Sequence, residues 1–538
     1  MLPCLFRTHC GGVRRVCLPL ALLLLILFVS PGTRDAVRAD AADRAATKAT
    51  LAYSSFLGGN NDDSVTDIAV DSQGNIYVLG DTYSTDLLGQ SVTISGNSDL
   101  YVAKFNPAGN VLLYLTLFGG PSDSQYPGAI EVDGQGNAYV SVYNLGADIP
   151  LKNPLWDEYS DSSQNGALFK LNGSGKLIYS TLIPLNMFPG VPNNGKSFAI
   201  DPAGNVYFTG TGYQNFDYRH QIELLKINAS ATDLQIAEYF GGPGDETGLA
   251  IYVDDAGYIY VAGITEYSDS FPITANAHQP ECGDITSGNQ STCVMDGVIV
   301  VFNPEGDIIY SSYHGGGGFD HPFSIDADGT GNILIAGDTN SADFPLANAL
   351  QTSCPIDGSG DCYQSRGFVS MIALNAAKSG LTYSTYLGST EKESSNSVRQ
   401  AVLDAAGRAT VIGYTNGQAF PTAGAIQPQR APGLCGQTGP LRQCNDAFIA
   451  TFSPTGALAF GTYLGGASDD YPQGVAVGGN GVIYLAGLTN SNNFPVTANA
   501  LQPYSLLKGN GFLSRIDLGG SPPPPTGPHI FLPAVLRK

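Results

Sequence analysis

One short segment of this sequence occurs seven times, and its spacing limits what the chain can fold into. The segment reads Y-S-S-F-L-G-G at residues 53–59. Its other copies begin near residues 114, 179, 236, 310, 383 and 460. A repeat of this length is typical of architectures in which each unit packs mainly against its neighbours.

Each copy is followed by the same order of short apolar runs and Gly-rich turns. In the last unit the apolar runs are residues 460–464, 474–477, 482–486 and 511–516. Apolar runs joined by Gly-rich turns indicate β-hairpins, and four such strands per unit describe a propeller blade. The sequence therefore predicts an all-β fold over residues 49–518: a seven-bladed β-propeller with four-stranded antiparallel blades. The alternative, a β-solenoid, needs shorter and more uniform units.

The two ends of the repeat region predict how the ring closes. After the strand at residues 512–518 the chain runs into Gly519, Gly520 and a run of prolines, so the last unit lacks a fourth strand. The first copy of the repeated segment, residues 50–57, stands before the first complete blade. We predict that this N-terminal strand pairs in the last blade and closes the ring.

The repeat resembles the bacterial SBBP family, which is named for its β-propeller repeat. The residues that carry the resemblance are Tyr383–Gly388, Asp469-Asp470, Gly474–Val477 and the run S-A-D-F-P at 341–345. The resemblance spans about residues 49–518 and is weakest in the first three units, which lack Phe-Pro. It implies a propeller fold and export, and it brings no catalytic residues.

The N-terminus has the pattern of a signal peptide. Arg7, Arg14 and Arg15 precede the uninterrupted apolar run 16–29, which is short for a membrane span. We expect residues 1–39 to be removed by cleavage after Ala39, with 40–48 as a short linker. The protein would then be secreted or held at the cell surface, without a transmembrane segment. A retained membrane anchor is the alternative.

The C-terminal end changes character after the last strand. Residues 519–528 form a Gly/Pro-rich linker, and residues 529–538 (H-I-F-L-P-A-V-L-R-K) form a short apolar tail. The tail is too short to span a membrane. It is expected to be a sorting or surface-retention signal, or to pack on the propeller.

The charge of the chain excludes two classes of partner. The full sequence carries 25 basic and 47 acidic residues, a net charge of −22. Removal of residues 1–39 takes five Arg and one Asp, which leaves a net charge of −26 (20 − 46). Such a surface repels nucleic acid and anionic lipid. It is compatible with cations, with neutral polymers, or with simple solubility.

Six cysteines remain after signal cleavage, and they fall into three close pairs. Because an even set in an exported chain indicates disulfides, we expect Cys282–Cys293, Cys354–Cys362 and Cys435–Cys444. Each pair lies in a long connection between the second and third strands of a unit, at residues 261–298, 335–368 and 412–448. These loops of units 4–6 would emerge at one edge of consecutive blades. They are the candidate binding surface, or loops that were stapled against proteolysis.

Acidic residues follow the repeated double glycine, and Asp62, Asp63, Asp469 and Asp470 are the candidates for calcium binding. Calcium takes six to eight oxygen ligands, so neighbouring blades would have to share the ion. The alternative is that these Asp side chains accept hydrogen bonds from turn amides. No cofactor is required by the sequence, and Ca²⁺ is the single candidate.

Trp156 and Tyr159 are a second candidate site, because two aromatic rings in one loop can stack on a sugar. The alternative is that Trp156 anchors its own loop. His314 and His321 flank a glycine run and could hold a metal, but we expect both to be solvated. His220 and His278 are expected on the surface.

The favoured function is a non-catalytic binding or structural scaffold at or outside a bacterial cell surface. Its partner would be an extracellular protein or a glycan, and the chain would be a monomer. The sequence lacks a GxSxG nucleophile motif, an HExxH zinc helix and a P-loop. The alternative is a hydrolase or lyase acting on polysaccharide, with carboxylates of several blades converging at the mouth of the channel.

Overall fold

A computed structural model of the chain separates it into two units, residues 1–47 and 48–538. The structure describes residues 48–519, apart from 121–124, 145–148, 159–164, 184–195, 214–219, 267–269, 284, 288–289, 293–294, 376–377, 437–440, 479–480 and 506–508. The predicted signal peptide 1–39, most of the linker 40–48 and the predicted tail 529–538 lie outside the described residues.

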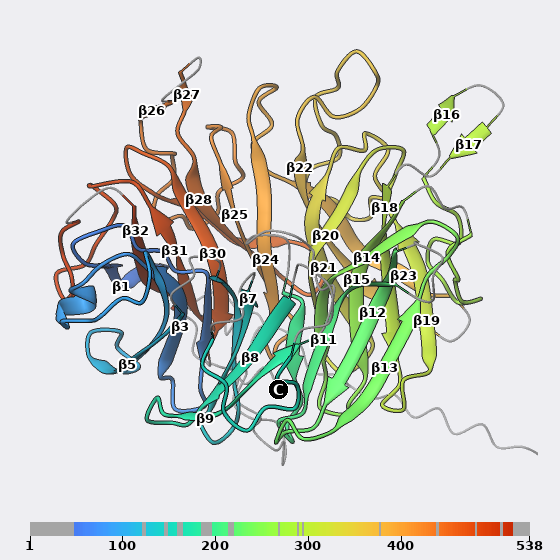
Figure 1. Cartoon of the computed structure of the whole chain (residues 1–538). Coiled ribbons are helices and arrows are strands. Elements are labelled where there is room, and N and C mark those ends of the chain that lie inside the picture. The colour runs from blue at the N-terminus through green and yellow to red at the C-terminus, as the bar shows by residue number, and fades with distance from the viewer. Residues whose placement is uncertain are drawn as a thin grey trace, which may run out of the picture. The chain divides into compact units, whose positions relative to one another are not determined.

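Residues 48–519 form seven four-stranded antiparallel sheets, the blades of a propeller (Figure 1). The first three blades are β2 (Asp67–Val70), β3 (Ile76–Thr82), β4 (Asp99–Phe105), β5 (Leu112–Phe118); β6 (Gln125–Val132), β7 (Ala138–Asn144), β8 (Asn165–Leu171), β9 (Leu177–Ile183); and β10 (Phe198–Ile200), β11 (Val206–Tyr213), β12 (His220–Ile227), β13 (Leu234–Phe240). The next three are β14 (Asp245–Val253), β15 (Ile259–Glu266), β18 (Met295–Phe302), β19 (Ile308–His314); β20 (Asp320–Ala327), β21 (Asn332–Thr339), β22 (Arg366–Ala373), β23 (Gly380–Leu387); and β24 (Asn396–Leu403), β25 (Ala409–Thr415), β28 (Asp446–Phe452), β29 (Leu458–Leu464).

Blade 7 contains strands from both ends of the described chain. It consists of β30 (Asp470–Val477), β31 (Val482–Thr489), β32 (Asn510–Asp517) and β1 (Thr50–Leu57), with β1 as the outermost strand. β1 pairs antiparallel with β32, and Phe56 lies opposite Phe512. The predicted seven-bladed fold and its closure by the N-terminal strand are therefore confirmed.

In blades 1–6 the turn between the first and second strands is closed by one aspartate. Asp71 accepts hydrogen bonds from the backbone N–H of Gln73 and Asn75, both at 2.9 Å, and Gly74 takes a positive φ of 82°. The hydroxyl of Tyr77 donates to the same carboxylate at 3.0 Å. Blades 2, 3 and 4 repeat the arrangement with Asp133, Asp201 and Asp254. This local set explains why the D-x-x-G-x-x-Y segments form hairpins.

The hydrophobic core lies between neighbouring blades. One cluster joins Ala262 and Ile299 of blade 4 to Ile335 and Phe368 of blade 5, all buried. The middle strands are buried on both faces; every residue of β4 and of β28, for example, is buried. Each blade is therefore stabilised by both neighbours, as expected for a repeat fold.

In five blades the loop between the second and third strands folds back along the outermost strand. In blade 5, Ala347 and Ser384 exchange two backbone hydrogen bonds, at 3.1 and 2.7 Å. Equivalent backbone bonds join the loop to the outer strand in blades 2, 4, 6 and 7, at Ser180, Ser311, Gly461 and Ser54. We call these loop segments the edge covers. They protect an outer strand edge that would otherwise expose unpaired backbone groups.

The described residues contain one short 3₁₀ turn, Leu87–Gly89, besides the strands. No helix within the described part of the chain has the length and apolar character needed to cross a membrane.

Candidate functional site

The three cysteine-containing loops project from the same end of the blades (Figure 1). The loop of blade 4 carries the small hairpin β16 (Ile285–Ser287) and β17 (Gln290–Thr292). The loop of blade 6 carries β26 (Leu434–Cys435) and β27 (Arg442–Gln443). The loop between β21 and β22 in blade 5 stands between them. We call the surface made by these loops, together with the adjacent loop of blade 7, the loop face.

Two predicted disulfides are confirmed. Cys354 and Cys362 are bonded with their Cα atoms 5.5 Å apart, and Cys435 and Cys444 with theirs 5.1 Å apart. Cys282 is also disulfide-bonded, and its predicted partner Cys293 lies outside the described residues. Each confirmed bond closes a loop of eight or nine residues. Short closed loops of this kind lose little further freedom when they bind a partner.

Large apolar side chains are exposed on these stapled loops. Ile356 lies between the bonded cysteines of blade 5 and is 58% exposed. Leu441 lies between those of blade 6 and is 65% exposed, and its neighbour Leu434 is 60% exposed. Tyr504, on the loop of blade 7, is 77% exposed. The loop face thus combines rigidity with apolar contact groups.

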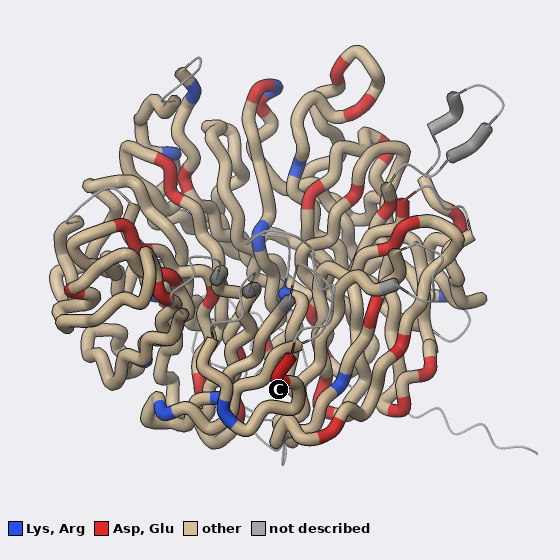
Figure 2. Tube along the Cα trace, viewed as in Figure 1, with Lys and Arg blue, Asp and Glu red and all other residues tan. Residues whose placement is uncertain are grey.

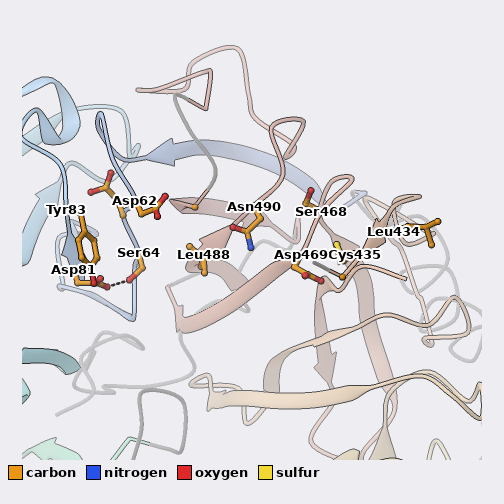
Figure 3. Close-up of a pocket in the computed structure, with 13 residues that line it drawn as sticks. Asp62, Ser64, Asp81, Tyr83, Leu434, Cys435, Ser468, Asp469, Leu488 and Asn490 are labelled. Atoms are coloured by element: carbon orange, nitrogen blue, oxygen red, sulfur yellow. Dashed lines mark hydrogen bonds between the residues drawn. The ribbon is translucent and has the colours of Figure 1, made fainter. Parts of the chain in front are cut away.

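A cleft of 530 Å³ lies beside the β26–β27 hairpin, where blades 6, 7 and 1 meet (Figure 3). Asp62, Ser64, Asp81 and Tyr83 of blade 1 line one side, and Leu434, Cys435, Ser468 and Asp469 line the other, with Leu488 and Asn490 between them. The cleft is lined by carboxylates, hydroxyls and one aromatic ring. These groups are suited to hydrogen-bonding a polar or cationic ligand group.

The carboxylates of this cleft are not equivalent. Asp469 forms a bidentate pair with Arg442, with both N–O distances at 2.9 Å, so its charge is balanced. Asp81 accepts a hydrogen bond from the Ser64 hydroxyl, and burial raises its pKa. Asp62 is exposed to solvent. Asp62 is therefore the carboxylate of this cleft that is most accessible to a cation.

The predicted calcium candidates Asp63 and Asp470 hold turns inside their blades. Asp63 accepts hydrogen bonds from the N–H of Gly59 at 2.7 Å and from the hydroxyls of Ser84 and Thr82. Burial raises its pKa to about 6. Asp470 repeats the arrangement with Gly466, Thr489 and Ser491, and burial raises its pKa to about 7. Asp62, Asp63 and Asp469 do line one cleft, which Asp470 does not reach.

Trp156 holds the edge cover of blade 2 in place. Its backbone N–H donates to the Thr181 hydroxyl at 2.9 Å, and its backbone carbonyl accepts from the N–H of Leu182 at 3.1 Å. The indole packs against the two clusters on either side of blade 2. These contacts agree with the alternative that Trp156 anchors its own loop. Tyr159 lies outside the described residues. A sugar platform at this pair stays a prediction.

The expectation that His314 is solvated and His278 lies on the surface is wrong. His314 is 1% exposed, and its Nδ1 lies 3.0 Å from Nε2 of His278. The other ring nitrogens reach Ser370 and Tyr310, each at 2.9 Å. The physical reason is that both histidines occupy positions that face the interior of a repeat unit.

The other two histidines behave differently. His321, which was also expected to be solvated, is partly buried and its Nε2 contacts the Met295 sulfur. His220 lies near the surface, with Nδ1 3.7 Å from Asp245.

Two small cavities lie among the innermost strands in the described part of the chain. Their volumes of 50 and 20 Å³ give room for individual waters. Lys196 lines both cavities and pairs with Asp67 at 3.3 Å and with Glu131 at 2.8 Å. The carboxylates of this region are thus engaged with a lysine.

Several other carboxylates have pKa values raised to about 7 by burial, and they are spread over separate blades (Figure 2 shows the scatter of acidic residues). Asp338 accepts hydrogen bonds from the Ser397 hydroxyl at 2.7 Å and from Val398 N–H at 2.8 Å. Asp446 accepts from Gln427 at 2.9 Å and from Ala431 at 2.8 Å. Both carboxylates therefore hold neighbouring chain segments.

A repeated glutamine was missed by the sequence reasoning. Gln351, Gln427 and Gln502 end the edge covers of blades 5, 6 and 7, and each side-chain carbonyl accepts the N–H of the glycine after the outer strand, at 2.9–3.1 Å. The signal was present as A-N-A-L-Q at 347–351 and 498–502. Trp156 stands where the other covers have this glutamine.

The comparison with family models agrees with the fold. Residues 53–87 and 459–495 match the SBBP model, described as a beta-propeller repeat. No curated protein matches the sequence.

Among solved structures, a protein of unknown function from Dyadobacter fermentans is 13% identical, with 70% of this chain and 97% of that chain covered and a TM-score of 0.35. The beta-propeller domain of the Trilobed protease from Pyrococcus furiosus is 8% identical, with 86% and 93% covered and a TM-score of 0.38. A protein from Lactobacillus plantarum is 10% identical, with 84% and 99% covered and a TM-score of 0.38. The two matched segments and the seven observed blades lead to one conclusion: this chain carries SBBP beta-propeller repeats within a seven-bladed propeller.

Proposed function

We propose that this chain is an exported, non-catalytic binding protein that holds an extracellular protein partner on its loop face. The disulfides favour an oxidising compartment, which supports export. Loops raised on a rigid scaffold are a common place for binding residues. In this reading the seven blades serve as the scaffold, and the stapled loops of blades 4–6 with the loop of blade 7 supply the contacts.

The observation that carries the proposal is the exposure of large apolar side chains on stapled loops. Single exposed apolar residues are normal on any protein surface. Here Ile356, Leu434, Leu441 and Tyr504 all stand on the loop face, and two of them lie inside closed disulfide loops. Apolar groups gathered on one face favour a protein partner over a glycan, because sugars present hydroxyls to their binding site.

The cleft adds polar specificity to this surface. Asp62 is accessible, and Tyr83, Ser468 and Asn490 offer further hydrogen-bonding groups around it. A lysine or arginine side chain of the partner fits this lining, because an accessible carboxylate attracts a cation. We therefore assign to the partner an apolar contact surface with a basic residue at its edge.

The carboxylate arrangement supports binding rather than hydrolysis. A glycosidase needs two carboxyl groups that face one substrate, roughly 5–10 Å apart. The raised-pKa carboxylates Asp338, Asp446 and Asp470 each accept hydrogen bonds from turns and strands of the blades instead. A carbohydrate panel assayed for both binding and hydrolysis tests this choice, and turnover of any glycan would contradict the proposal.

Site-specific photocrosslinking in the producing cells tests the proposed face. A photoreactive phenylalanine analogue replaces Leu441 on the loop face in one variant. In the matched control it replaces Ser174, an exposed residue of the turn between β8 and β9 at the opposite end of the blade. We expect one defined protein adduct from position 441 and none from position 174. Equal adducts at both positions, or none at 441, would refute the proposal.

A further inference from the structure

The outermost strand of blade 1, β5, has no edge cover. The loop that could supply one, residues 83–98, is fully described and turns the other way. Leu88 of this loop donates its N–H to Gly58 of the closing strand's end at 3.1 Å, and Val92 bonds back to Thr85. The loop therefore bonds toward blade 7, and among the described residues it forms no backbone hydrogen bond with β5.

The burial of β5 reflects this difference. In β23 of blade 5, every residue from Tyr383 to Leu387 is buried. In β5 only Phe118 is buried, and Leu113 is 49% exposed. The strand reads L-L-Y-L-T-L-F and contains no charged residue. Natural edge strands are usually shortened, charged or covered, because an open apolar edge recruits another strand.

The backbone of β5 presents unpaired groups at the position that the covers use elsewhere. Leu115 of β5 corresponds to Ser384 of β23, since each follows the repeated tyrosine. Ser384 exchanges two backbone hydrogen bonds with its cover residue Ala347. Within the described part of the chain, Leu115 has no backbone partner on that outer side.

An apolar pocket of 270 Å³ adjoins the end of β5, between blades 1 and 2. It is lined by Leu117 and Phe118 of β5, by Phe169 and Leu177 of blade 2, by Asp99, and by Thr93 of the 83–98 loop. In blades 5, 6 and 7 a phenylalanine of the edge cover packs on the aromatic residues of its own blade, as Phe344 does on Phe368 at 4.7 Å. The pocket offers room for an apolar side chain of that kind.

Asp99 supplies a polar anchor in the same pocket. It is 5% exposed, and its Oδ1 has no hydrogen-bond partner among the described residues. Its counterpart in blade 6, Asp446, also begins the third strand and accepts the Gln427 side chain of the cover at 2.9 Å. A covering segment on β5 would bring such an amide to Asp99, because the same glutamine reaches both the aspartate and the outer strand's glycine.

We propose that β5 is an acceptor edge for an extended segment of a partner polypeptide, which adds a fifth strand to blade 1. The internal covers define the chemistry of the segment: Phe-Pro, then alternating small residues, then an apolar residue and glutamine. Backbone hydrogen bonds to Leu115 supply affinity, and the pocket with Asp99 supplies selectivity, as in other cases of β-strand addition. This site is separate from the loop face.

Peptide binding to the full protein tests the proposal. The probe is a fluorescein-labelled synthetic peptide with the sequence of residues 343–352, D-F-P-L-A-N-A-L-Q-T. The control peptide replaces its glutamine by glutamate, which places a second carboxylate beside Asp99. We expect saturable anisotropy for the probe and binding weaker by about tenfold or more for the control, since one charge-linked hydrogen bond is replaced by repulsion.

Two protein variants locate the peptide on β5. Leu115→Pro removes the outer N–H at a position where an edge strand tolerates proline, and Leu115→Lys adds a charge to the edge without that backbone change. We expect both variants to lose binding by about tenfold or more while remaining folded. Because the Leu115 side chain packs against the cluster between blades 7 and 1, their melting temperatures should be lower than the parent's. Protection of the Leu115 amide from hydrogen exchange on peptide addition provides a readout that does not depend on either variant.

Three results would overturn the inference. The first is no saturable binding of the probe to the parent protein. The second is equal binding by the parent and by both folded variants. The third is a dimer of the parent that light scattering detects at rising concentration and that Leu115→Lys abolishes, because a second copy of this chain would then occupy the edge.

Discussion

The substitution Phe56→Ala tests whether the ring is held by its N-terminal strand. Phe56 is 1% exposed and lies opposite Phe512 in the pairing of β1 with β32. Its ring centroid is 6.2 Å from that of Phe494, which belongs to the edge cover of blade 7. Its N–H donates to the carbonyl of Gln502 at 3.2 Å. Phe56 thus joins three segments that are distant in sequence.

The expected cost follows from this burial. Truncating a buried phenylalanine to alanine costs about 3–5 kcal/mol, and a domain's total stability is about 5–15 kcal/mol. Deleting residues 40–57 also removes Tyr53 and Leu57, both 0% exposed. Burial of three large apolar side chains contributes on the order of 5–9 kcal/mol. We therefore expect the deletion to prevent stable ring closure, and the point variant to remain folded with a much lower melting temperature.

Urea unfolding with intact disulfides, followed by fluorescence, measures both effects. The matched control is Leu113→Ala on β5, the outer strand of blade 1, where the side chain is 49% exposed. This control should change the free energy of unfolding by less than about 0.5 kcal/mol. The free energy of unfolding of Phe56→Ala could instead lie within about 1 kcal/mol of the parent's, or the deletion variant could unfold at the same urea concentration as the parent. Either result would show that β1 does not hold the ring.

Three further predictions concern the buried polar groups. Burial raises the pKa of Asp470 to about 7, so its contribution to stability falls as the pH rises from about 4 to about 7. Blade 6 has an asparagine, Asn396, at the equivalent position. The variant Asp470→Asn should therefore show a smaller change in its urea midpoint over this pH range than the parent. Burial lowers the pKa of His278 to about 4 and that of His314 well below its ordinary value, so the parent should lose stability as the pH falls from about 6.5 toward 4. The double variant His278→Leu/His314→Leu should lose less over that window in the same measurement. Chelation of divalent metals should leave the melting temperature unchanged in calorimetry, because Asp63 and Asp470 already accept hydrogen bonds from protein donors; a rise on adding calcium would contradict this assignment.

The blade number and the closing strand could be predicted because their signals are local and repeated. The turn aspartate, the glycine with positive φ and the following tyrosine act within seven residues, as at Asp71, Gly74 and Tyr77. The count of strands at the two chain ends then required one strand to cross from the beginning to the end. The observed pairing of Thr50–Leu57 with β32 follows directly from that count.

The edge covers were missed because their sequence resembles a loop. The segment at 344–351 reads F-P-L-A-N-A-L-Q, with a proline and an asparagine among its apolar residues. Its backbone bonds are made at Ser384, more than thirty positions away. The alternation of apolar residues that identifies a strand is absent from such a segment. Alignment of the repeats against one another would have shown the recurrent glutamine.

The cleft and the contact between His278 and His314 could not be predicted from any single segment of the sequence. The lining of the cleft comes from loops near residues 62, 81, 434, 469 and 490, which meet only when blade 1 closes against blade 7. His278 aligns with Leu350 and Leu501 in the other covers, and His314 aligns with Leu387. Their burial follows from those positions, whereas an isolated histidine in a glycine-rich turn indicates a solvated residue.

Residues that the repeats share have a different role from residues that vary between the blades. Four shared positions are bonded or packed within the blades: the second acidic residue, the Thr that ends the second strand, the Ser two positions later and the Phe of the cover. Asp470, Thr489, Ser491 and Phe494 show this in blade 7. The side chains of the shared pattern therefore stabilise the blades. Recognition must depend on positions where blades depart from that pattern. Two such departures stand out: the stapled loops of blades 4–6, and the uncovered edge of β5 in blade 1.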